Sequence, residues 1–266
     1  SYFSIYHFHS LEHLAALLYT FYWAGGISRQ VQMETIMKRL LYILFLCFWF
    51  IHAQDYKITF FGLPAVDVNM AVDENKINFS IQTVGLINLI WPTENQYTVT
   101  YNSSHFGLLN YEKKIKQGTN KYKLAAAYYP EDSTLHYEQT TLKRVPEIQT
   151  IFTLLARVQK ESVEALDTKW FPMDHDGELF SARFLWADTS TISIANSTIL
   201  CDHYRLDIKA QDDVTSTPEQ SDYFMNNIVS PEVVRQIWVE KYGLRRIIQA
   251  TVNIYGIKII AKIDHV

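Results

Sequence analysis

The sequence predicts a mainly β protein, a single curved antiparallel sheet (an open half-barrel) of about 10–12 strands around one central amphipathic helix. Two observations predict the sheet: apolar and polar residues alternate after Gln54, and turn-forming sequences separate the alternating segments. A third observation, one stretch of helical periodicity in mid-chain, predicts the helix. The 266 residues are enough for one large β domain with a substantial core.

The residues before Gln54 are typical of an export signal. Lys38 and Arg39 form a short positive region, and Leu40–Ile51 is an uninterrupted apolar run. Such a run is too short to span a bilayer but fits the hydrophobic part of a signal peptide. We expect cleavage after Ala53 and a periplasmic or secreted mature chain. The alternative is an uncleaved N-terminal anchor.

The position of the first methionines bears on the segment before this signal. Met33 and Met37 stand directly ahead of the basic pair, and a signal peptide belongs at the start of a protein. We interpret residues 1–32 as upstream, non-coding translation or a leader, and residues 33–53 as the signal peptide. Residues 54–266 then form a single β-rich domain.

Strands are predicted wherever side chains alternate with a period of two. Val66, Val68 and Met70 share one face of an extended segment, with Asp67 and Asn69 on the other. The same period recurs at residues 77–82, 97–101, 180–186, 203–209 and 257–263. One buried and one solvated face is the mark of antiparallel sheet.

Turns are predicted where the alternating segments must reverse. They fall at Asp73–Asn75, Gln117–Asn120, Asp174–Gly177 and Tyr242–Gly243. The carboxylates and histidine of residues 174–176 are also metal-ligand types, but no second cluster has ligand spacing. We therefore interpret this segment as a turn and expect no metal and no cofactor.

One segment has helical periodicity. Its apolar residues are Ile148, Ile151, Phe152, Leu155 and Val158. Pro146 suits a first helical turn and Glu147 complements a helix N-terminus, so we expect an amphipathic helix of about three turns from Pro146.

Charge and known motifs argue against nucleic-acid binding and catalysis. The net charge is −4 and basic blocks are absent from the sequence, so we expect no nucleic-acid partner. The densest basic cluster, Lys113, Lys114 and Lys116, we interpret as a solvated strand edge. No Gly-rich phosphate loop, Gly-x-Ser-x-Gly elbow or His-Glu-x-x-His pair occurs in the sequence, so we expect a protein that is not an enzyme.

The two cysteines, Cys47 and Cys201, suggest neither lipidation nor a disulfide. Cys47 follows Leu46, where a lipoprotein signal needs a small residue, so we expect that the protein is not a lipoprotein. Removal of the signal would leave Cys201 as the single thiol. Cys201 and His203 share a strand face and could meet, but nucleophilic catalysis also needs an oxyanion site and an orienting group. We interpret Cys201 as structural.

The large apolar residues are the main candidates for a site. They either fill an ordinary β core or line a concave cradle, partly covered by the helix, for an apolar ligand. The residues expected to line such a cradle are Val66, Val68, Met70, Ile151, Phe152, Leu155, Phe180, Phe184 and Trp186.

Several short motifs resemble those of a bacterial envelope family called domain of unknown function 3108. The sequence Phe-Phe-Gly-Leu-Pro-Ala at residues 60–65 is similar to its opening strand motif. Further motifs follow in order at residues 83–85, 148–158, 171–178, 237–239 and 255–261. The resemblance covers about residues 56–263. It implies no agreed activity, and a fold similar to the half-barrel of lipoprotein-localisation carriers and receptors, which hold acyl chains under a helical lid.

These observations lead to three functional expectations. The first is a non-enzymatic periplasmic protein of the cell envelope that binds an apolar or lipid-like ligand, such as a lipoprotein acyl chain, in a β-sheet cradle. The second is an envelope scaffold with a filled core that binds another envelope protein. The third, a hydrolase of envelope polymers, lacks paired catalytic groups. We expect membrane contact only through the signal segment.

Overall fold

A computed structural model describes residues 52–60, 62–211, 222–254 and 256–265. The chain divides into two units, Ser1–Phe50 and Ile51–Val266, and all described residues belong to the second. The segment predicted to precede the protein, and the predicted signal peptide up to Ile51, lie outside the described residues.

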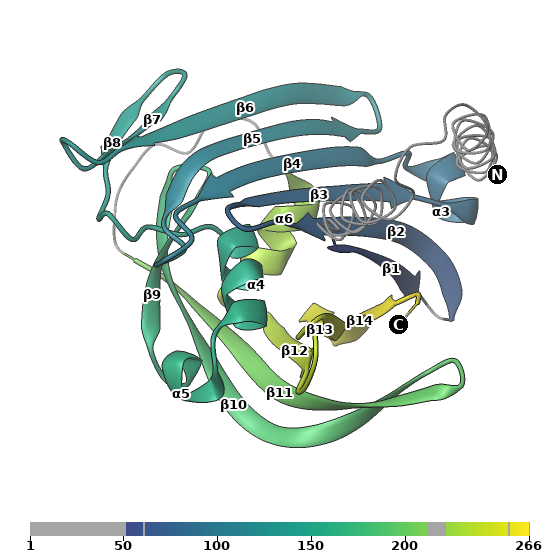
Figure 1. Cartoon of the computed structure of the whole chain (residues 1–266). Coiled ribbons are helices and arrows are strands. Elements are labelled where there is room, and N and C mark those ends of the chain that lie inside the picture. Colours follow the sequence, from purple (N-terminus) through teal and green to yellow (C-terminus); the bar gives the residue numbers. More distant parts are fainter. Residues whose placement is uncertain (1–51, 61, 212–221, 255, 266) are drawn as a thin grey trace, which may run out of the picture. The chain divides into compact units, whose positions relative to one another are not determined.

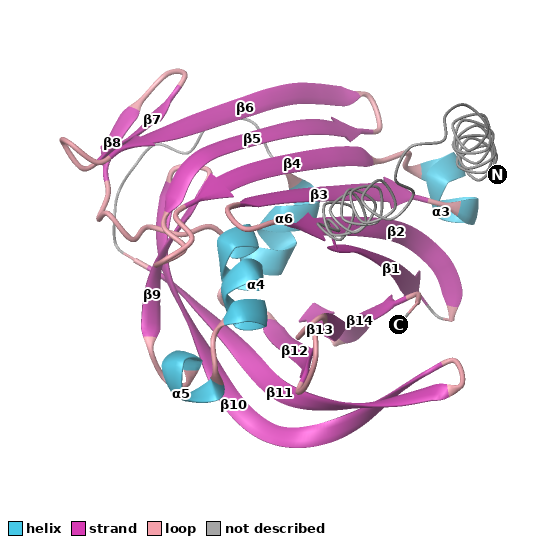
Figure 2. Ribbon diagram, viewed as in Figure 1, coloured by secondary structure: helices cyan, strands magenta, loops and turns pink. Residues whose placement is uncertain are grey.

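Fourteen strands of the described part form one antiparallel sheet, which confirms the predicted fold class (Figures 1 and 2). Their bounds are β1 His52–Phe60, β2 Leu63–Val72, β3 Lys76–Thr83, β4 Glu94–Tyr101, β5 Leu108–Gln117, β6 Asn120–Tyr129, β7 Thr134–Tyr137, β8 Thr141–Lys143, β9 Trp170–His175, β10 Glu178–Ile194, β11 Ser197–Ala210, β12 Val234–Glu240, β13 Ile247–Ile254 and β14 Ile257–Ile263. The helices are α3 Gly85–Ile90, α4 Ile151–Lys160, α5 Val163–Leu166 and α6 Tyr223–Val229. The predicted strand number was too low, because strands as short as β7 and β8 hold too few residues to show a period.

Two meanders make up the sheet. The strand order runs from β8 down to β1, continues at β14 and descends to β9, so that only the β1–β14 pairing joins distant parts of the chain. That pairing sets Tyr56 opposite Ile263 and Ile58 opposite Ala261. The order ends at β8 and β9, and the sheet is not closed by strand pairing between them.

The first strand also carries the predicted cleavage point. Ala53 pairs with Ala71 of β2, and the next side chain, Gln54, is buried. Gln54 Nε2 donates to Gln159 Oε1 of α4 at 2.7 Å, and its Oε1 accepts from the Ile247 amide at 3.1 Å. A chain cleaved after Ala53 would therefore begin on a residue that ties β1 to α4 and β13.

Helix α4 lies inside the curve of the sheet (Figure 1). Most of its side chains are buried, including Ile151, Phe152, Leu154 and Val158. Phe152 is the centre of an aromatic cluster, with its ring centroid 4.8 Å from that of Tyr97. The helix thus supplies the layer against which the inner face of the sheet packs.

The predicted start of this helix at Pro146 was wrong. The helix begins at Ile151, after a capping box in which Thr150 and Thr153 each bond the other's backbone amide. The residues just ahead of it bond to strands instead: the Ile148 carbonyl accepts from the Leu108 amide of β5 at 2.7 Å, and Gln149 forms an isolated bridge to β9. This backbone pairing overrides the helical periodicity that Ile148 shares with α4.

Buried ion pairs fasten β9 and its turn to the opposite end of the sheet. The Asp176–Gly177 turn has φ of 53° and 93°, as a two-residue hairpin turn requires. The carboxylates of Asp174 and Asp176 do more than turn the chain, because Asp174 accepts from Arg144 Nε at 2.8 Å and Asp176 pairs with Lys113 of β5. The interpretation of Lys113 as a solvated edge residue was wrong: β5 lies between β4 and β6, and Lys113 is 1% exposed.

The Lys113–Asp176 pair gives a testable prediction about this connection. Lys113→Met should lower the free energy of unfolding by about 3–5 kcal/mol, because it leaves a buried carboxylate without its partner. Asp176→Asn, which tolerates a positive φ, should also destabilise. The double variant should lose much less than the sum of the two, as measured by urea denaturation. Additive losses would contradict a direct pairing.

The interior is rich in buried tyrosines. Burial raises the pKa of Tyr56, Tyr97, Tyr111 and Tyr137 well above the usual 10.0. Burial, with a smaller contribution from Asp73 and Glu74, raises the pKa of Tyr101 to about 12. The folded protein therefore holds these phenolic protons to a higher pH than the unfolded chain does.

The raised pKa values predict an alkaline limit to stability. The contribution of Tyr101 is complete below about pH 10, the unfolded value, and is lost as the pH rises towards about 12. Urea denaturation across this range should show a steep fall in stability with a parallel rise in tyrosinate absorbance. Tyr101→Phe should make that fall shallower, and an unchanged slope would contradict the assignment.

Candidate functional site

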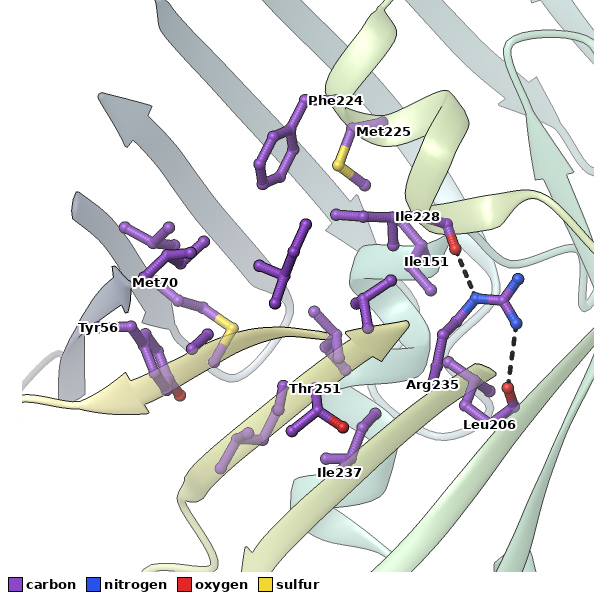
Figure 3. Close-up of a pocket in the computed structure, with 18 of the residues that line it drawn as sticks. Tyr56, Met70, Ile151, Leu206, Phe224, Met225, Ile228, Arg235, Ile237 and Thr251 are labelled. Atoms are coloured by element: carbon purple, nitrogen blue, oxygen red, sulfur yellow. Dashed lines mark hydrogen bonds between the residues drawn. The ribbon is translucent and has the colours of Figure 1, made fainter. Parts of the chain in front are cut away.

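An apolar pocket of about 270 Å³ lies between α4, α6 and the inner face of the sheet (Figure 3). From β1–β3 it is lined by Tyr56, Ile58, Val68, Met70 and Phe79, and from the helices by Ile151, Phe152, Leu155, Phe224, Met225, Asn227 and Ile228. From β11–β14 it is lined by Leu206, Arg235, Gln236, Ile237, Ile247, Ala250, Thr251, Val252, Ile254, Ile259 and Ala261. The pocket therefore sits where the two meanders meet at β1 and β14.

Arg235 is the one charged residue among the described residues that line this pocket, and its guanidinium points away from it (Figure 3). It donates to the carbonyls of Ile228 and Ser230 at the end of α6, and to those of Val233 and Leu206 at 2.8 and 3.2 Å. Burial lowers the pKa of Arg235 to about 10. The aliphatic stem thus faces the pocket, while the charge caps the helix C-terminus.

A buried carboxylate holds the other end of α6. Asp222 caps the helix by accepting from the Met225 amide, and it also accepts from Tyr97 of β4 at 2.6 Å and from Gln117 of β5 at 3.1 Å. Asp222 is fully buried. Charged or polar side chains therefore anchor both ends of α6, so its apolar residues form a positioned wall of the pocket.

The structure brings together five of the nine residues predicted to form the cradle. Val68, Met70, Ile151, Phe152 and Leu155 line the pocket. They come from β2 and from α4, the helix that was expected to cover part of the cradle. That they contact a ligand stays a prediction.

The other four predicted residues lie elsewhere. Val66 is half-buried beside the core, while Phe180 and Phe184 are buried outside the pocket lining. Trp186 is 43% exposed and directly precedes a bulge, where the β10–β11 register shifts between Trp186 and Asp188. This bulge turns the strand and ends the regular burial of alternate residues.

Sequence reasoning missed the wall made by α6. Its apolar residues Phe224, Met225 and Ile228 follow a helix-capping Asp222, which was the available signal. A helix of seven residues is too short for its periodicity to stand out. The contribution of β12 and β13 was missed because only the β1–β14 pairing brings them into the same sheet as β1 and β2.

The cysteine and histidine considered for catalysis are placed for packing. Cys201 is a fully buried free thiol, and burial raises its pKa to about 11, which reduces the thiolate fraction at neutral pH. The His203 ring stacks on Trp238 with centroids 4.3 Å apart, and its Nδ1 lies 3.3 Å from Asp188. The described residues contain no group of three or more metal-ligating side chains. None of the helices in the described part is long and apolar enough to cross a membrane.

Comparison with known proteins supports the fold. No family model matches the chain, and no curated protein matches its sequence. A similar solved structure is the crystal structure of a beta-barrel-like protein of domain of unknown function DUF1849 from Brucella abortus. The two align with a TM-score of 0.52 and 8% identity, over 79% of this chain and 94% of that chain. The likeness shows a β-barrel-like fold of unknown function. The similar structure belongs to domain of unknown function 1849, which is not the family 3108 that the sequence motifs resemble.

The anchoring of α6 yields a prediction. Arg235→Met keeps the apolar stem but removes the donor from four buried or partly buried carbonyls, so it should cost at least about 3 kcal/mol of stability. Hydrogen exchange should quicken at residues 223–229 well before it does in β3–β5. Uniform protection across both regions would contradict the role of Arg235 as an anchor. Arg205→Met, at an exposed position on the outer face, is the matched control.

Proposed function

We propose that this protein binds an apolar, lipid-like ligand in the pocket between α4, α6 and the sheet. The observation that carries the proposal is a cavity of about 270 Å³ whose walls are almost wholly apolar. Interiors normally pack with few voids larger than a water molecule, so a partly open apolar hollow of this size among core side chains is unusual. The polar residues of the lining also support an apolar ligand, because Arg235 and Thr251 donate their hydrogen bonds to other groups of the protein.

The size of the pocket restricts the ligand. An apolar cavity of about 150 Å³ is enough to bind benzene, and ligand pockets usually begin near 300 Å³. A volume of about 270 Å³ therefore suits one narrow apolar group, such as part of an acyl chain, better than a bulky polycyclic molecule. The absence of an unpaired charge in the described lining favours an uncharged segment of the ligand.

Export completes the proposal. The basic pair at residues 38–39, the apolar run to Ile51 and Ala53 support secretion to a periplasm, where the protein would act without enzymatic activity as a carrier or receptor of lipid. The order of the motifs between residues 60 and 261 supports a relationship to domain of unknown function 3108. The lipoprotein acyl chain stays the favoured ligand under this proposal, on the analogy of the fold.

A cavity-filling variant tests the proposal. Ala250 lies on β13 with its side chain at the pocket, so Ala250→Phe should occupy the space that a ligand would use. The full chain, as processed in its host, should bind a fluorescent fatty acid. The variant should bind the same fatty acid at least about tenfold more weakly. Because filling a cavity adds packing contacts, the variant should be as stable as the parent or more so.

The matched control is Ala125→Phe, the same substitution at an exposed position of β6. It should leave fatty-acid binding unchanged. Native mass spectrometry before and after solvent extraction should reveal a co-purifying lipid in the parent and less of it in Ala250→Phe. Equal uptake by the parent and Ala250→Phe, or no uptake by either, would reject the pocket as a lipid site.

A further inference from the structure

Helix α3 exposes apolar side chains that the fold does not use. None of its residues is buried, and Leu86, Leu89 and Ile90 are 68%, 80% and 79% exposed. Trp91, which follows the helix, is 49% exposed. We call these four residues the α3 tip. Single exposed apolar residues are ordinary, but a contiguous group on one short helix marks an interaction surface.

The hairpin from β3 to β4 is complete without this helix. The Thr83 amide donates to the Thr93 carbonyl at 3.1 Å, and the Thr93 amide donates to the Thr83 hydroxyl at 2.8 Å. The strands are therefore already joined at residues 83 and 93, and residues 84–92 form an excursion beyond that junction. An excursion whose apolar residues stay in solvent adds nothing to the core.

A group of lysines lies beside the tip, on the outer face of β5 and β6. Register sets Lys114 opposite Lys123 and Lys116 opposite Lys121, and we call these four residues the lysine ladder. Like charges directly opposite each other destabilise a sheet. Lys114 and Lys116 are partly offset by Glu112 and Glu94, each at 3.1 Å. Lys121 and Lys123 form no ion pair with a carboxylate of the described residues.

Contacts between the residues next to the tip and the turn between the two ladder strands place the tip beside the ladder. The Gly118 amide, in the turn between β5 and β6, donates to the Pro92 carbonyl at 2.8 Å. A Cβ on Gly118 would lie 4.0 Å from the Trp91 ring. Figure 1 shows α3 and the β5–β6 turn at the same end of their strands. Apolar and cationic groups are thus combined in one surface.

We propose that the α3 tip and the lysine ladder dock on a bilayer surface containing anionic lipid. A bilayer fits this chemistry, since apolar side chains enter the acyl boundary, tryptophan favours the interface and lysines attract anionic headgroups. The tip projects from the hairpin rather than forming a groove, so it needs no shape-matched partner. The proposal replaces the expectation of membrane contact only through the signal segment, and it does not depend on what the pocket holds.

Vesicle flotation tests the proposal. The samples are point variants of the full chain as it is processed in its host, so that all of them carry the same amino-terminal sequence. The vesicles contain phosphatidylcholine and phosphatidylglycerol in equal parts, or phosphatidylcholine alone. Leu89→Ser with Ile90→Ser should weaken binding at least about tenfold. Lys121→Gln with Lys123→Gln should weaken it by roughly fivefold for each lysine on the mixed vesicles only. Both variants should unfold at the parent's temperature or above.

Matched controls use exposed residues away from the tip. Tyr242→Ser with Leu244→Ser, in the loop between β12 and β13, and Lys169→Gln with Lys209→Gln should bind as the parent does. Brominated lipid should quench the Trp91 emission, obtained as the difference between the parent and Trp91→Phe. Absence of that quenching, or tip variants that bind vesicles like the parent, would overturn the proposal and indicate that the tip contacts another protein instead. Equal binding to both vesicle types would overturn the role of the ladder.

Discussion

The buried ion pairs around the β9–β10 turn are the constraint on which the rest of the structure depends. Asp174 with Arg144 and Asp176 with Lys113 draw the last strands of the sheet order against β5 and the segment after β8. These charged groups are costly to desolvate, and a buried charge without its partner is strongly destabilising. Each pair therefore holds its two strands or segments in one relative position. The pairing of Ile148 and Gln149 with β5 and β9 adds backbone hydrogen bonds to the same connection. The sheet therefore curves around α4 without closing by strand pairing.

Curvature alone would give a filled core, and α6 accounts for the pocket. Its ends are fixed by Asp222 and Arg235, both of which bond to the sheet rather than to α4. The helix is thus held where its apolar side chains border a space instead of collapsing into it. The same arrangement keeps the charge of Arg235 out of that space, so the pocket stays apolar although a cation stands in its wall.

Folding therefore leaves two apolar surfaces unfilled, one a pocket between α4, α6 and the sheet and the other on α3. The pocket, which is partly open to solvent, suits a small apolar group, and the exposed α3 tip suits a lipid surface. Similarity to a β-barrel-like protein at 8% identity supports the fold but identifies neither surface. What each surface can bind follows from its side chains: their apolar character, their positions and the hydrogen bonds that they make.

The sequence by itself determined the local features of this protein. Alternation marked the strands, the Asp-Gly pair marked a hairpin turn, and helical periodicity marked α4, because each depends on residues only a few positions apart. It also determined that Val68, Met70, Phe152 and their neighbours on β2 and α4 would face inward.

Only the tertiary structure decided which of these elements meet. It ended the backward extension of α4 at Thr150 by pairing Ile148 and Gln149 with strands, and it turned Lys113 inward towards Asp176. It also brought β12–β14 and α6 to the pocket and left Phe180 and Phe184 outside its lining. The physical reason is that strand pairing and ion pairing join residues far apart in the chain, and local periodicity carries no information about such partners.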